Sequence, residues 1–387
     1  MERRERTCAV INLDAIRHNY GAIRRTFHGV GIMTVMKADA YGHGIAGILP
    51  ACDPHTDWYA VAAMEEGREI RAWGSTKPVL LFGPVPAGQM EEAARLGLTF
   101  TVGSLAYGEL LASKLKPHGL QAQIHWKIDT GLNRTGFRWR DDRAGEVLEE
   151  LKQVMAMGCF DVTGTYTHLA CPEPDEPEDV WFTEEQIRLF RAATTAMEQE
   201  GLPVGLRHAC STGGALKHPD YRLDMVRLGM MVYGQCDTVA HAEAHGLIPA
   251  LCWKAYVTQI EPLKQGEWVS YGRTFRAERD LVLGVVSCGY ADGYRRSYQS
   301  WGKVLAGGKV VRTFGRVCMD YLLVDLTDVE APQVGMEVVL LGRQGTEEIS
   351  VIELAEAMGS TCGEITAAIG KRVVRHYEQE EPQCSIF

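Results

Sequence analysis

Apolar runs alternate with amphipathic stretches from the start of the chain to about residue 235. The runs have the length and composition of buried strands, and the stretches between them carry apolar residues at helical spacing. Repeated strand–helix units over this length predict either a closed (β/α)8 barrel of the TIM type or a doubly wound sheet. The expected strands are 8–13, 31–36, 58–62, 79–83, 98–102, 121–128, 162–168, 206–209 and 225–228. A first helix is expected over 15–27, with Asp14 as its N-cap.

After about residue 240 the pattern changes to β-branched or apolar runs joined by Gly, Asp and Pro turns, which predicts an all-β second domain. The runs are 251–260, 281–286, 303–312, 321–326 and 337–341, and one helix is expected over 350–358. We therefore assign residues 1–240 to a barrel domain and 241–387 to a C-terminal β domain. Residues 1–10 can pack with the second of these.

Composition excludes several classes of protein. The chain has 387 residues, a formal net charge of −10 and no long basic run, which argues against nucleic acid as a partner. No apolar stretch approaches the roughly 20 residues that span a bilayer. The 11 cysteines are scattered without metal-ligand spacing, so we expect no metal, no disulfide framework and a cytoplasmic location.

Lys37 is the first candidate for chemistry, because it ends the apolar run 31–36 and precedes a glycine-rich loop. A desolvated lysine has a lowered pKa and becomes nucleophilic toward a carbonyl. The glycines that follow let the backbone approach a ligand. The segment therefore suggests a pyridoxal phosphate (PLP) enzyme in which Lys37 forms the Schiff base. Lys37, His168, Ser211 and Arg227 all lie at or just after strand ends, which is the catalytic face of a barrel.

Seven motifs extend this hypothesis over nearly the whole chain. They are KADAYGHG (37–44), KIDTGLNR (127–134), THLA (167–170), MVRLGM (225–230), VSYG (269–272), GYADGYRR (289–296) and GRVCMD (315–320). Together and in this order they resemble the alanine racemase family. The resemblance implies a PLP-binding barrel, a mainly β C-terminal domain, and a homodimer whose active sites use both subunits. It also implies a small amino-acid substrate and a role in D-alanine supply for peptidoglycan.

The resemblance implies two catalytic bases. Racemisation removes a proton from one face of a planar carbanion and returns one to the other face, so two groups should flank it. Lys37 would serve one face, and Tyr271 of the partner subunit would serve the other. The same likeness places Tyr41, Ser211, Gly229 and Met230 on the cofactor phosphate.

Arg227 resembles the family residue that faces the pyridine nitrogen, and His168 is expected in the cofactor pocket in contact with it. An arginine does not readily give up a proton, so the ring nitrogen should stay unprotonated, which fits racemisation better than transamination.

Four further residues are assigned to the substrate side of the site. Arg134 and the backbone of Met319 match residues that bind the substrate carboxylate, and Tyr290 matches the wall of the entry corridor. Lys127 matches a lysine that is carbamylated in several family members. A bare lysine with a bound anion is the alternative at this position.

Two positions depart from the family pattern. Cys210 replaces the usual asparagine before Ser211, and Gly363 stands where a tyrosine commonly lines the substrate pocket. The predicted activity is racemisation of L-alanine to D-alanine. Gly363 makes serine or a broader set of amino acids the alternative substrate. A fold-related decarboxylase and a non-catalytic PLP carrier are the competing classes. Arg227 and VSYG argue against the first, and the second domain argues against the other.

Overall fold

A computed structural model of the chain describes residues 5–236 and 238–379. Its described residues form two compact units, each of which is treated separately below. The barrel unit contains Ile23–Ala38 and Leu49–Val232. The β unit contains the segment before residue 23, the loop Asp39–Ile48, and the chain from Tyr233 onward.

Eight parallel strands make the wall of the barrel unit, and each pairs with the next in the order β10-β2-β3-β4-β5-β6-β8-β9. They are β2 (Gly31–Val35), β3 (Trp58–Val61), β4 (Val79–Leu81), β5 (Leu98–Val102), β6 (Ala122–Asp129), β8 (Phe160–Tyr166), β9 (Leu206–His208) and β10 (Met225–Leu228). Backbone hydrogen bonds from Asp224 N to Arg207 O (3.0 Å) and from Arg227 N to Cys210 O (3.1 Å) link the two end strands. The predicted barrel is confirmed.

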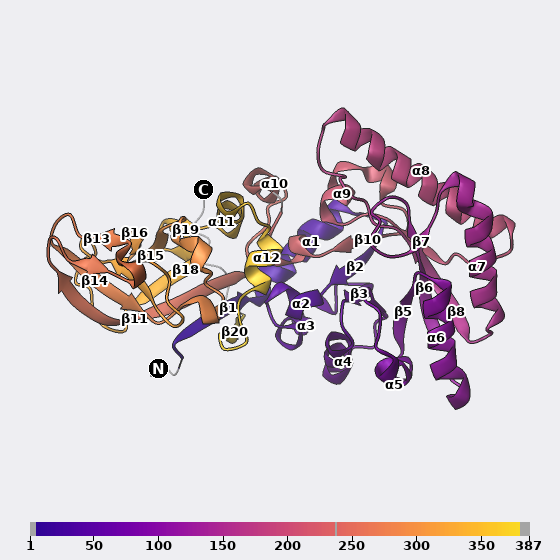
Figure 1. The fold of residues 1–387 in the computed structure, drawn as a ribbon, viewed down its shortest axis with the longest axis horizontal. Coiled ribbons are helices and arrows are strands. Elements are labelled where there is room, and N and C mark those ends of the chain that lie inside the picture. Colours follow the sequence, from indigo (N-terminus) through magenta and orange to yellow (C-terminus); the bar gives the residue numbers. More distant parts are fainter. Residues whose placement is uncertain (1–4, 237, 380–387) are drawn as a thin grey trace. The chain divides into compact units, whose positions relative to one another are not determined.

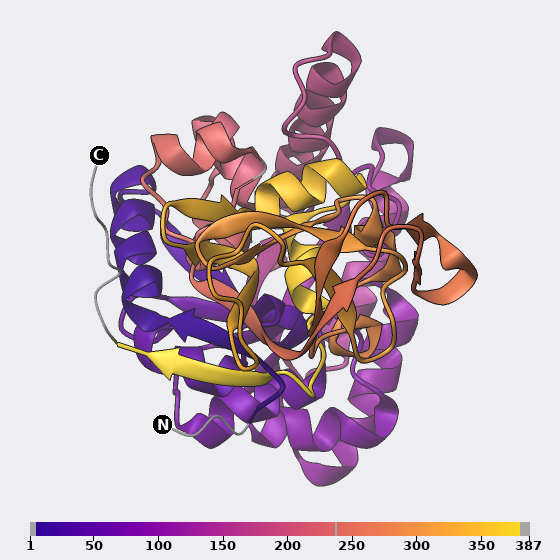
Figure 2. The same cartoon turned by 90° about the vertical axis from the view of Figure 1, so that its left-hand side faces the viewer.

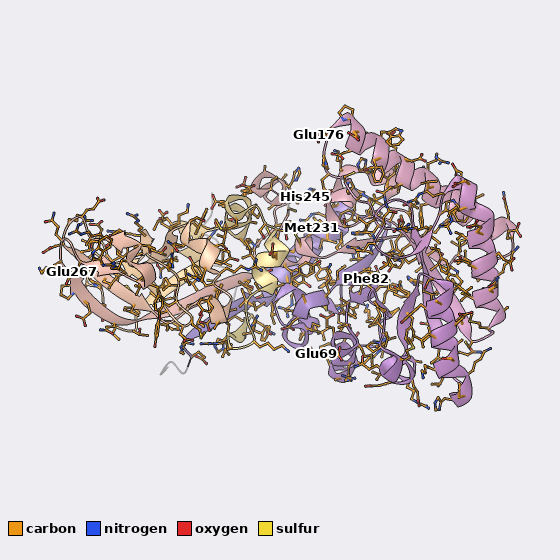
Figure 3. All side chains as sticks on the ribbon, viewed as in Figure 1. Glu69, Phe82, Glu176, Met231, His245 and Glu267 are labelled. Carbon is orange, nitrogen blue, oxygen red and sulfur yellow. The ribbon has the colours of Figure 1, made fainter. Side chains whose placement is uncertain are left out.

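Helices cover the outer surface of this wall (Figure 1). They are α4 (Met64–Trp73), α5 (Met90–Arg95), α6 (Leu105–Leu115), α7 (Ala144–Ala156), α8 (Pro177–Gln199) and α9 (Thr212–Lys217). Figure 3 shows Glu69 on α4 and Glu176 at the start of α8. Ser104 shows why a helix begins where it does, because its side chain accepts a hydrogen bond from Tyr107 N at the start of α6.

Helix α1 (Leu13–Thr26) begins earlier than the sequence pattern suggested. Asn12 Oδ1 accepts hydrogen bonds from the backbone N–H groups of Asp14 and Ala15, both at 2.9 Å. The prediction of Asp14 as the cap was therefore wrong. Asn12 ends strand β1 (Thr7–Asn12) and supplies the acceptor, which leaves Asp14 inside the first turn.

The β unit is built on one mixed sheet with the order β19-β18-β15-β16-β17-β14-β11-β1-β20. Its strands after β1 are β11 (Leu251–Leu263), β14 (Leu281–Val286), β15 (Lys303–Ala306), β16 (Lys309–Phe314), β17 (Leu322–Asp325), β18 (Glu337–Gln344), β19 (Glu347–Ile349) and β20 (Val374–Glu378). The N-terminal strand β1 pairs antiparallel with β11 and parallel with β20, its neighbour in Figure 2. The predicted mainly β second part is confirmed.

The run 303–312, expected as one strand, is a hairpin of β15 and β16. Gly307 and Gly308 form its turn with φ of +60° and +74°, a conformation that two consecutive glycines adopt without steric cost. Two helices close the β unit, α11 (Val351–Met358) and α12 (Cys362–Ala367). Among the residues described, no helix has the length and apolar character needed to cross a membrane.

Candidate active site

The barrel unit gathers its candidate residues at the carboxyl ends of its strands. Lys37 lies two residues after β2, and His168 lies two residues after β8. Ser211 follows β9, and Arg227 lies within β10 next to its last residue. This edge is where barrel enzymes place their catalytic groups, because loops of independent length can bring side chains together there.

Arg227 is the most extensively bonded side chain of this group. It is buried, and its NH2 group donates to His168 Nδ1 at 2.9 Å and to the Thr167 and Ala209 carbonyls at 3.0 and 2.5 Å. Its NH1 group donates to His208 Nδ1 at 3.0 Å. Within the described chain no carboxylate pairs with it, and burial lowers the pKa of Arg227 to about 10. The predicted contact with His168 is confirmed.

The histidines around Arg227 are held neutral. Burial, together with the charges of Arg227, Lys127, Arg134 and Lys37 in that order, lowers the pKa of His168 to about 2. All four cations therefore act on one imidazole. Such a concentration of positive charge is stable only when an anion or a neutralised lysine relieves it.

Lys127 is one of these four cations, and the charges of Arg227 and Arg134 act on it. Its Nζ atom is 4.8 Å from the centroid of the Tyr166 ring, which also lies 5.5 Å from the Arg227 guanidinium carbon. Burial and the charges of Arg227 and Arg134 together lower the pKa of Lys127 to about 7, while the charge of Asp129 opposes the shift. The ring of Phe82, which is labelled in Figure 3 and follows β4, lies 6.0 Å from that of Tyr166. An amine with this pKa is partly neutral at physiological pH and can react as a nucleophile.

Lys37 is also made less basic by its surroundings. Burial lowers the pKa of Lys37, and the charge of Arg134 lowers it further, while Glu66 opposes the shift. The side chain of Arg134 is exposed, and its backbone N–H is fixed by Asp129 Oδ2 at 3.1 Å. The sequence argument for a desolvated amine at the end of β2 agrees with this environment.

Three groups near the ends of β9 and β10 have hydrogen-bonding capacity to spare. Ser211 occupies the N-cap position of α9, but its hydroxyl makes no capping bond. The backbone N–H groups of Gly229 and Met230 donate to no acceptor among the described residues. These groups can therefore bind an anion.

Tyr41, in the β unit, is the last residue of a strained segment. Residues 38–41 all have φ near +54°, so α2 (Lys37–Tyr41) is a turn of left-handed helix after its first residue. This conformation costs roughly 1–2 kcal/mol per non-glycine residue. Asp39 holds the next turn, because its carbonyl accepts from Gly42 N (3.0 Å) and Gly44 N (2.9 Å).

His43 supports the same loop from inside. Its Nδ1 atom donates to the Ala40 and Tyr41 carbonyls at 3.0 and 3.1 Å, and burial lowers the pKa of His43 to about 4. Its ring stacks on Tyr233 with centroids 4.4 Å apart, and Tyr233 lies 5.4 Å from the Tyr41 ring. The Tyr41 phenol is thus fixed by aromatic packing, and burial raises the pKa of Tyr41 to about 12.

Arg375 fastens this loop to the end of the chain. Its Nε atom donates to Gly42 O at 3.1 Å. Its other nitrogens donate to the carbonyls of Ile369 (2.7 Å), Gly370 (2.6 Å) and Val373 (2.7 Å). One guanidinium therefore satisfies four carbonyls and joins the left-handed turn to the segment that follows α12.

Tyr271 lies in a second loop of the β unit, between strands β12 (Trp268–Val269) and β13 (Phe275–Arg276). Its side chain is 68% exposed in the single chain. The hydroxyl of Ser270 donates to Arg316 O at 2.8 Å and accepts from Arg316 N at 3.1 Å. This pair of bonds fixes the Tyr271 loop to the loop that carries Met319.

Met319 and Tyr290 are joined through backbone bonds. Tyr290 N donates to Cys318 O, and Ala291 N donates to Met319 O, both at 3.0 Å. The Met319 N–H has no acceptor among the residues that the structure describes. The β unit thus brings together Tyr271, Tyr290 and Met319, as the barrel unit brings together Lys37, Lys127, Arg134, His168 and Arg227.

Sequence reasoning missed His125, Tyr166, His208 and Arg375. One signal was available, because His125 and Lys127 alternate along β6 and alternate strand residues point to the same face. His208 and Tyr166 end their strands without any motif to mark them. The structure offers no cluster of His, Cys, Asp or Glu suited to a metal ion in 5–236 or 238–379.

Two family models cover most of the chain. The alanine racemase N-terminal domain matches residues 11–237, and the alanine racemase C-terminal domain matches residues 250–377. An alanine racemase of Cutibacterium acnes is 36% identical over 95% of this chain and 97% of that protein. One from Symbiobacterium thermophilum is 35% identical over 97% of both chains.

Solved structures agree with these matches. The crystal structure of alanine racemase from a D-cycloserine-producing Streptomyces lavendulae aligns with a TM-score of 0.89 at 31% identity, covering 98% of this chain and 99% of that one. The Bacillus anthracis alanine racemase with bound L-Ala-P gives a TM-score of 0.89 at 29% identity, with 98% and 96% covered. Sequence and fold together show that this chain belongs to the alanine racemase family.

Proposed function

We propose that this protein interconverts L-alanine and D-alanine with PLP, the cofactor on which its family depends. The observation that carries the proposal is Arg227, which is buried, fixed by His168 and His208, and paired with no carboxylate in the described chain. Arg227 would face the pyridine nitrogen and would leave it unprotonated, because the guanidinium keeps its proton. This arrangement would favour return of the proton to the substrate Cα over transfer of the amino group.

The residues present fit the cofactor. Lys37 has a lowered pKa and can bond the PLP carbonyl. The Ser211 hydroxyl and the N–H groups of Gly229 and Met230 have no protein partner in the described chain and suit a phosphate. Tyr41 is the further phosphate ligand that we assign, and its high pKa keeps it a hydrogen-bond donor. When bound, PLP withdraws electron density from the substrate Cα and makes its proton removable.

Two bases complete the reaction. Lys37 Nζ takes or returns the proton on one face of Cα, and the lowered pKa of this amine favours the neutral form that acts as a base. The hydroxyl of Tyr271 from a second copy of the chain acts on the opposite face. Its exposure in the single chain and its fixed loop are consistent with a residue that completes another subunit's site.

The substrate carboxylate is assigned to Arg134 and to the Met319 N–H, which lacks an acceptor in the described chain. Tyr290 would line the entry. Lys127 is proposed to carry a carbamate, since its pKa of about 7 leaves much of the amine neutral and able to react with CO2. The carbamate would add negative charge to this cluster of cations, beside that of Asp129.

Further proposals accompany the reaction. The protein would form a homodimer with shared active sites, in which the proposed C-terminal domain, residues 241–387, carries Tyr271 to the partner. It works in the cytoplasm, where its ten described cysteines stay reduced, and D-alanine for peptidoglycan is its product. Serine is the second candidate substrate because Gly363 removes a side chain from the proposed pocket.

The first experiment measures D-alanine by chiral chromatography and the absorbance band of bound PLP in parallel. Lys37→Ala should lose both. Tyr271→Phe should keep the band and lose most racemisation, and full activity in this variant would refute the two-base assignment. A PLP carrier would show the band and no D-alanine in the unmutated protein.

A subunit-mixing experiment tests the shared site. Each single variant has no working site, but a dimer that combines Lys37→Ala with Tyr271→Phe contains one site with both natural residues. Random exchange should therefore restore about a quarter of the unmutated activity. No recovery from a mixture shown to exchange subunits would place both bases in one subunit.

A further inference from the structure

His125 lies at the end of a hydrogen-bonded chain that starts at Arg227. Arg227 NH1 donates to His208 Nδ1 at 3.0 Å, and the other ring nitrogen of His208, Nε2, lies 3.0 Å from His125 Nδ1. Both histidines have 0% exposed surface. The remaining nitrogen of His125, Nε2, is buried without a partner.

The direction of every bond in this chain follows from Arg227. A guanidinium can only donate, so His208 Nδ1 must accept and its proton must reside on Nε2. His208 therefore donates to His125 Nδ1, which leaves the proton of His125 on its own Nε2. Burial and the charge of Arg227 lower the pKa of both imidazoles, that of His125 to about 3, so neither carries a second proton.

The barrel wall is shaped around the ring of His125. The register of β6 and β8 shifts between Ile124 and His125, which brings Gly164 opposite the histidine. A Cβ atom on Gly164 would lie only 2.6 Å from His125 Cε1 and Nε2, so any other residue there would displace the ring. A bulge and a glycine both weaken a strand interior, and here they make space for one side chain.

The ring of Tyr166 restrains His208. Tyr166 stacks on His208 with centroids 4.9 Å apart and an interplanar angle of 6°, and its hydroxyl is 3.0 Å from Thr101 Oγ1. His208 can therefore neither tilt toward Tyr166 nor rotate without losing its bond to His125. The plane and tautomer of His208 are fixed from two directions, and with them the position of the Arg227 guanidinium.

We propose that His125 is a positioning residue for Arg227, which it orients through the acceptor it offers to His208. The inference rests on the proposed function, in which Arg227 sets the charge on the cofactor ring. It explains why the barrel keeps a buried imidazole with one unsatisfied N–H where an apolar residue would pack at lower cost. His125 touches neither substrate nor cofactor in this assignment and acts only through His208.

The hydrogen-bonded chain is tested directly in the unmutated holoenzyme by nitrogen NMR with 15N-labelled histidine. We expect His125 and His208 both to carry a single proton on Nε2, with that of His208 protected from exchange with water. Signals are assigned by their loss in His125→Asn and His208→Asn. A proton on Nδ1 of His208, or a doubly protonated ring at either position, overturns the proposal.

Variants separate positioning from packing. His125→Leu removes the acceptor at similar volume, whereas His125→Asn keeps an acceptor near the Nδ1 position. We expect His125→Leu to lower kcat about tenfold and to raise the pyruvate released per D-alanine formed by a similar factor, the size typical of outer-shell partners. His125→Asn should remain within about threefold of the unmutated enzyme in both.

The matched control is Thr99→Val. It also removes a buried polar group without a partner, the Thr99 hydroxyl, on β5 of the same barrel. It should leave kcat and the pyruvate ratio unchanged. A folded His125→Leu with the unmutated ratio, or a His125→Asn as impaired as His125→Leu, refutes the proposal. If His125→Leu does not fold, the NMR result decides. If the unmutated protein makes no D-alanine, the proposed function fails. The NMR experiment still tests the hydrogen bonds that join Arg227, His208 and His125.

Discussion

A Cβ atom at position 363 would lie 3.0 Å from both Cδ1 and Cε1 of the Tyr41 ring. The space that a side chain at position 363 would occupy is therefore not empty. The ring of Tyr41 packs directly against the backbone of α12, and any side chain there would push it away. Since Tyr41 is the residue assigned to the cofactor phosphate, the departure at Gly363 bears on cofactor binding as well as on substrate choice.

Replacing Gly363 by alanine should weaken PLP binding. Overpacking of this kind costs about 1–3 kcal/mol, and 1.4 kcal/mol corresponds to about a tenfold change in affinity. We expect about a tenfold higher Kd for PLP, measured by fluorescence titration of the apoenzyme. Gly145→Ala is the matched control, because this helical glycine has nothing within 4 Å of a built Cβ and should leave the Kd unchanged. Equal affinity in both variants would show that Tyr41 adapts freely.

The substrate is the subject of a second prediction. If Gly363 enlarges the pocket, kcat/KM for L-serine should fall within about tenfold of that for L-alanine, because one hydroxymethyl group is a small difference to a permissive pocket. Gly363→Tyr, assayed at saturating PLP because its side chain also displaces Tyr41, should restrict the remaining turnover to alanine. Chiral chromatography on a panel of L-amino acids measures both. Activity confined to alanine in the unmutated protein and in Gly363→Tyr would reject serine as a substrate.

Arg375 should be essential to the stability of the left-handed turn. Arg375→Lys keeps the charge but cannot reach the carbonyls of Gly42, Ile369, Gly370 and Val373 together. Each buried carbonyl left without a donor costs about 1–3 kcal/mol, so we expect Tm to fall by at least about 5 °C in calorimetry.

The control for Arg375 is an arginine whose loss should matter little. Arg343 is exposed and pairs with Glu348 at 2.7 Å, so Arg343→Lys should shift Tm by no more than about 1 °C. PLP affinity should fall in the Arg375 variant alone, because Arg375 holds the loop that carries Tyr41. Unchanged Tm and affinity in Arg375→Lys would contradict this role.

Lys127 gives a prediction for pH. Its folded-state pKa is about 7, well below its ordinary value, so below pH 7 the folded protein contains a buried ammonium. From pH 7 toward the ordinary lysine pKa only the unfolded chain holds this proton, and stability rises with pH. Lys127→Met, measured in CO2-free buffer, should therefore raise Tm by several degrees below pH 7, and this gain should shrink steadily above pH 7. A gain independent of pH would indicate a packing effect instead.

The sequence predicts some elements of the molecule more accurately than others. The alternation of apolar runs predicted the barrel strands closely, because burial on both faces leaves a continuous apolar signature. The run 303–312 predicts one strand where the structure has the β15–β16 hairpin, since Gly307-Gly308 interrupts the apolar pattern only briefly. The cap of α1 was misplaced because Asn12 and Asp14 are both good caps, and only the end of β1 decides between them.

The sequence by itself determined the family, the order of strands and helices, and the candidates Lys37, Arg227 and Tyr271, because those depend on local pattern and on motifs. Only the tertiary structure decided that His125 reaches Arg227 through His208, that Arg375 fastens the Tyr41 loop, and that Tyr41 fills the space above Gly363. Each of these joins residues from distant strands or loops. Such contacts depend on register and burial, which no local spacing records.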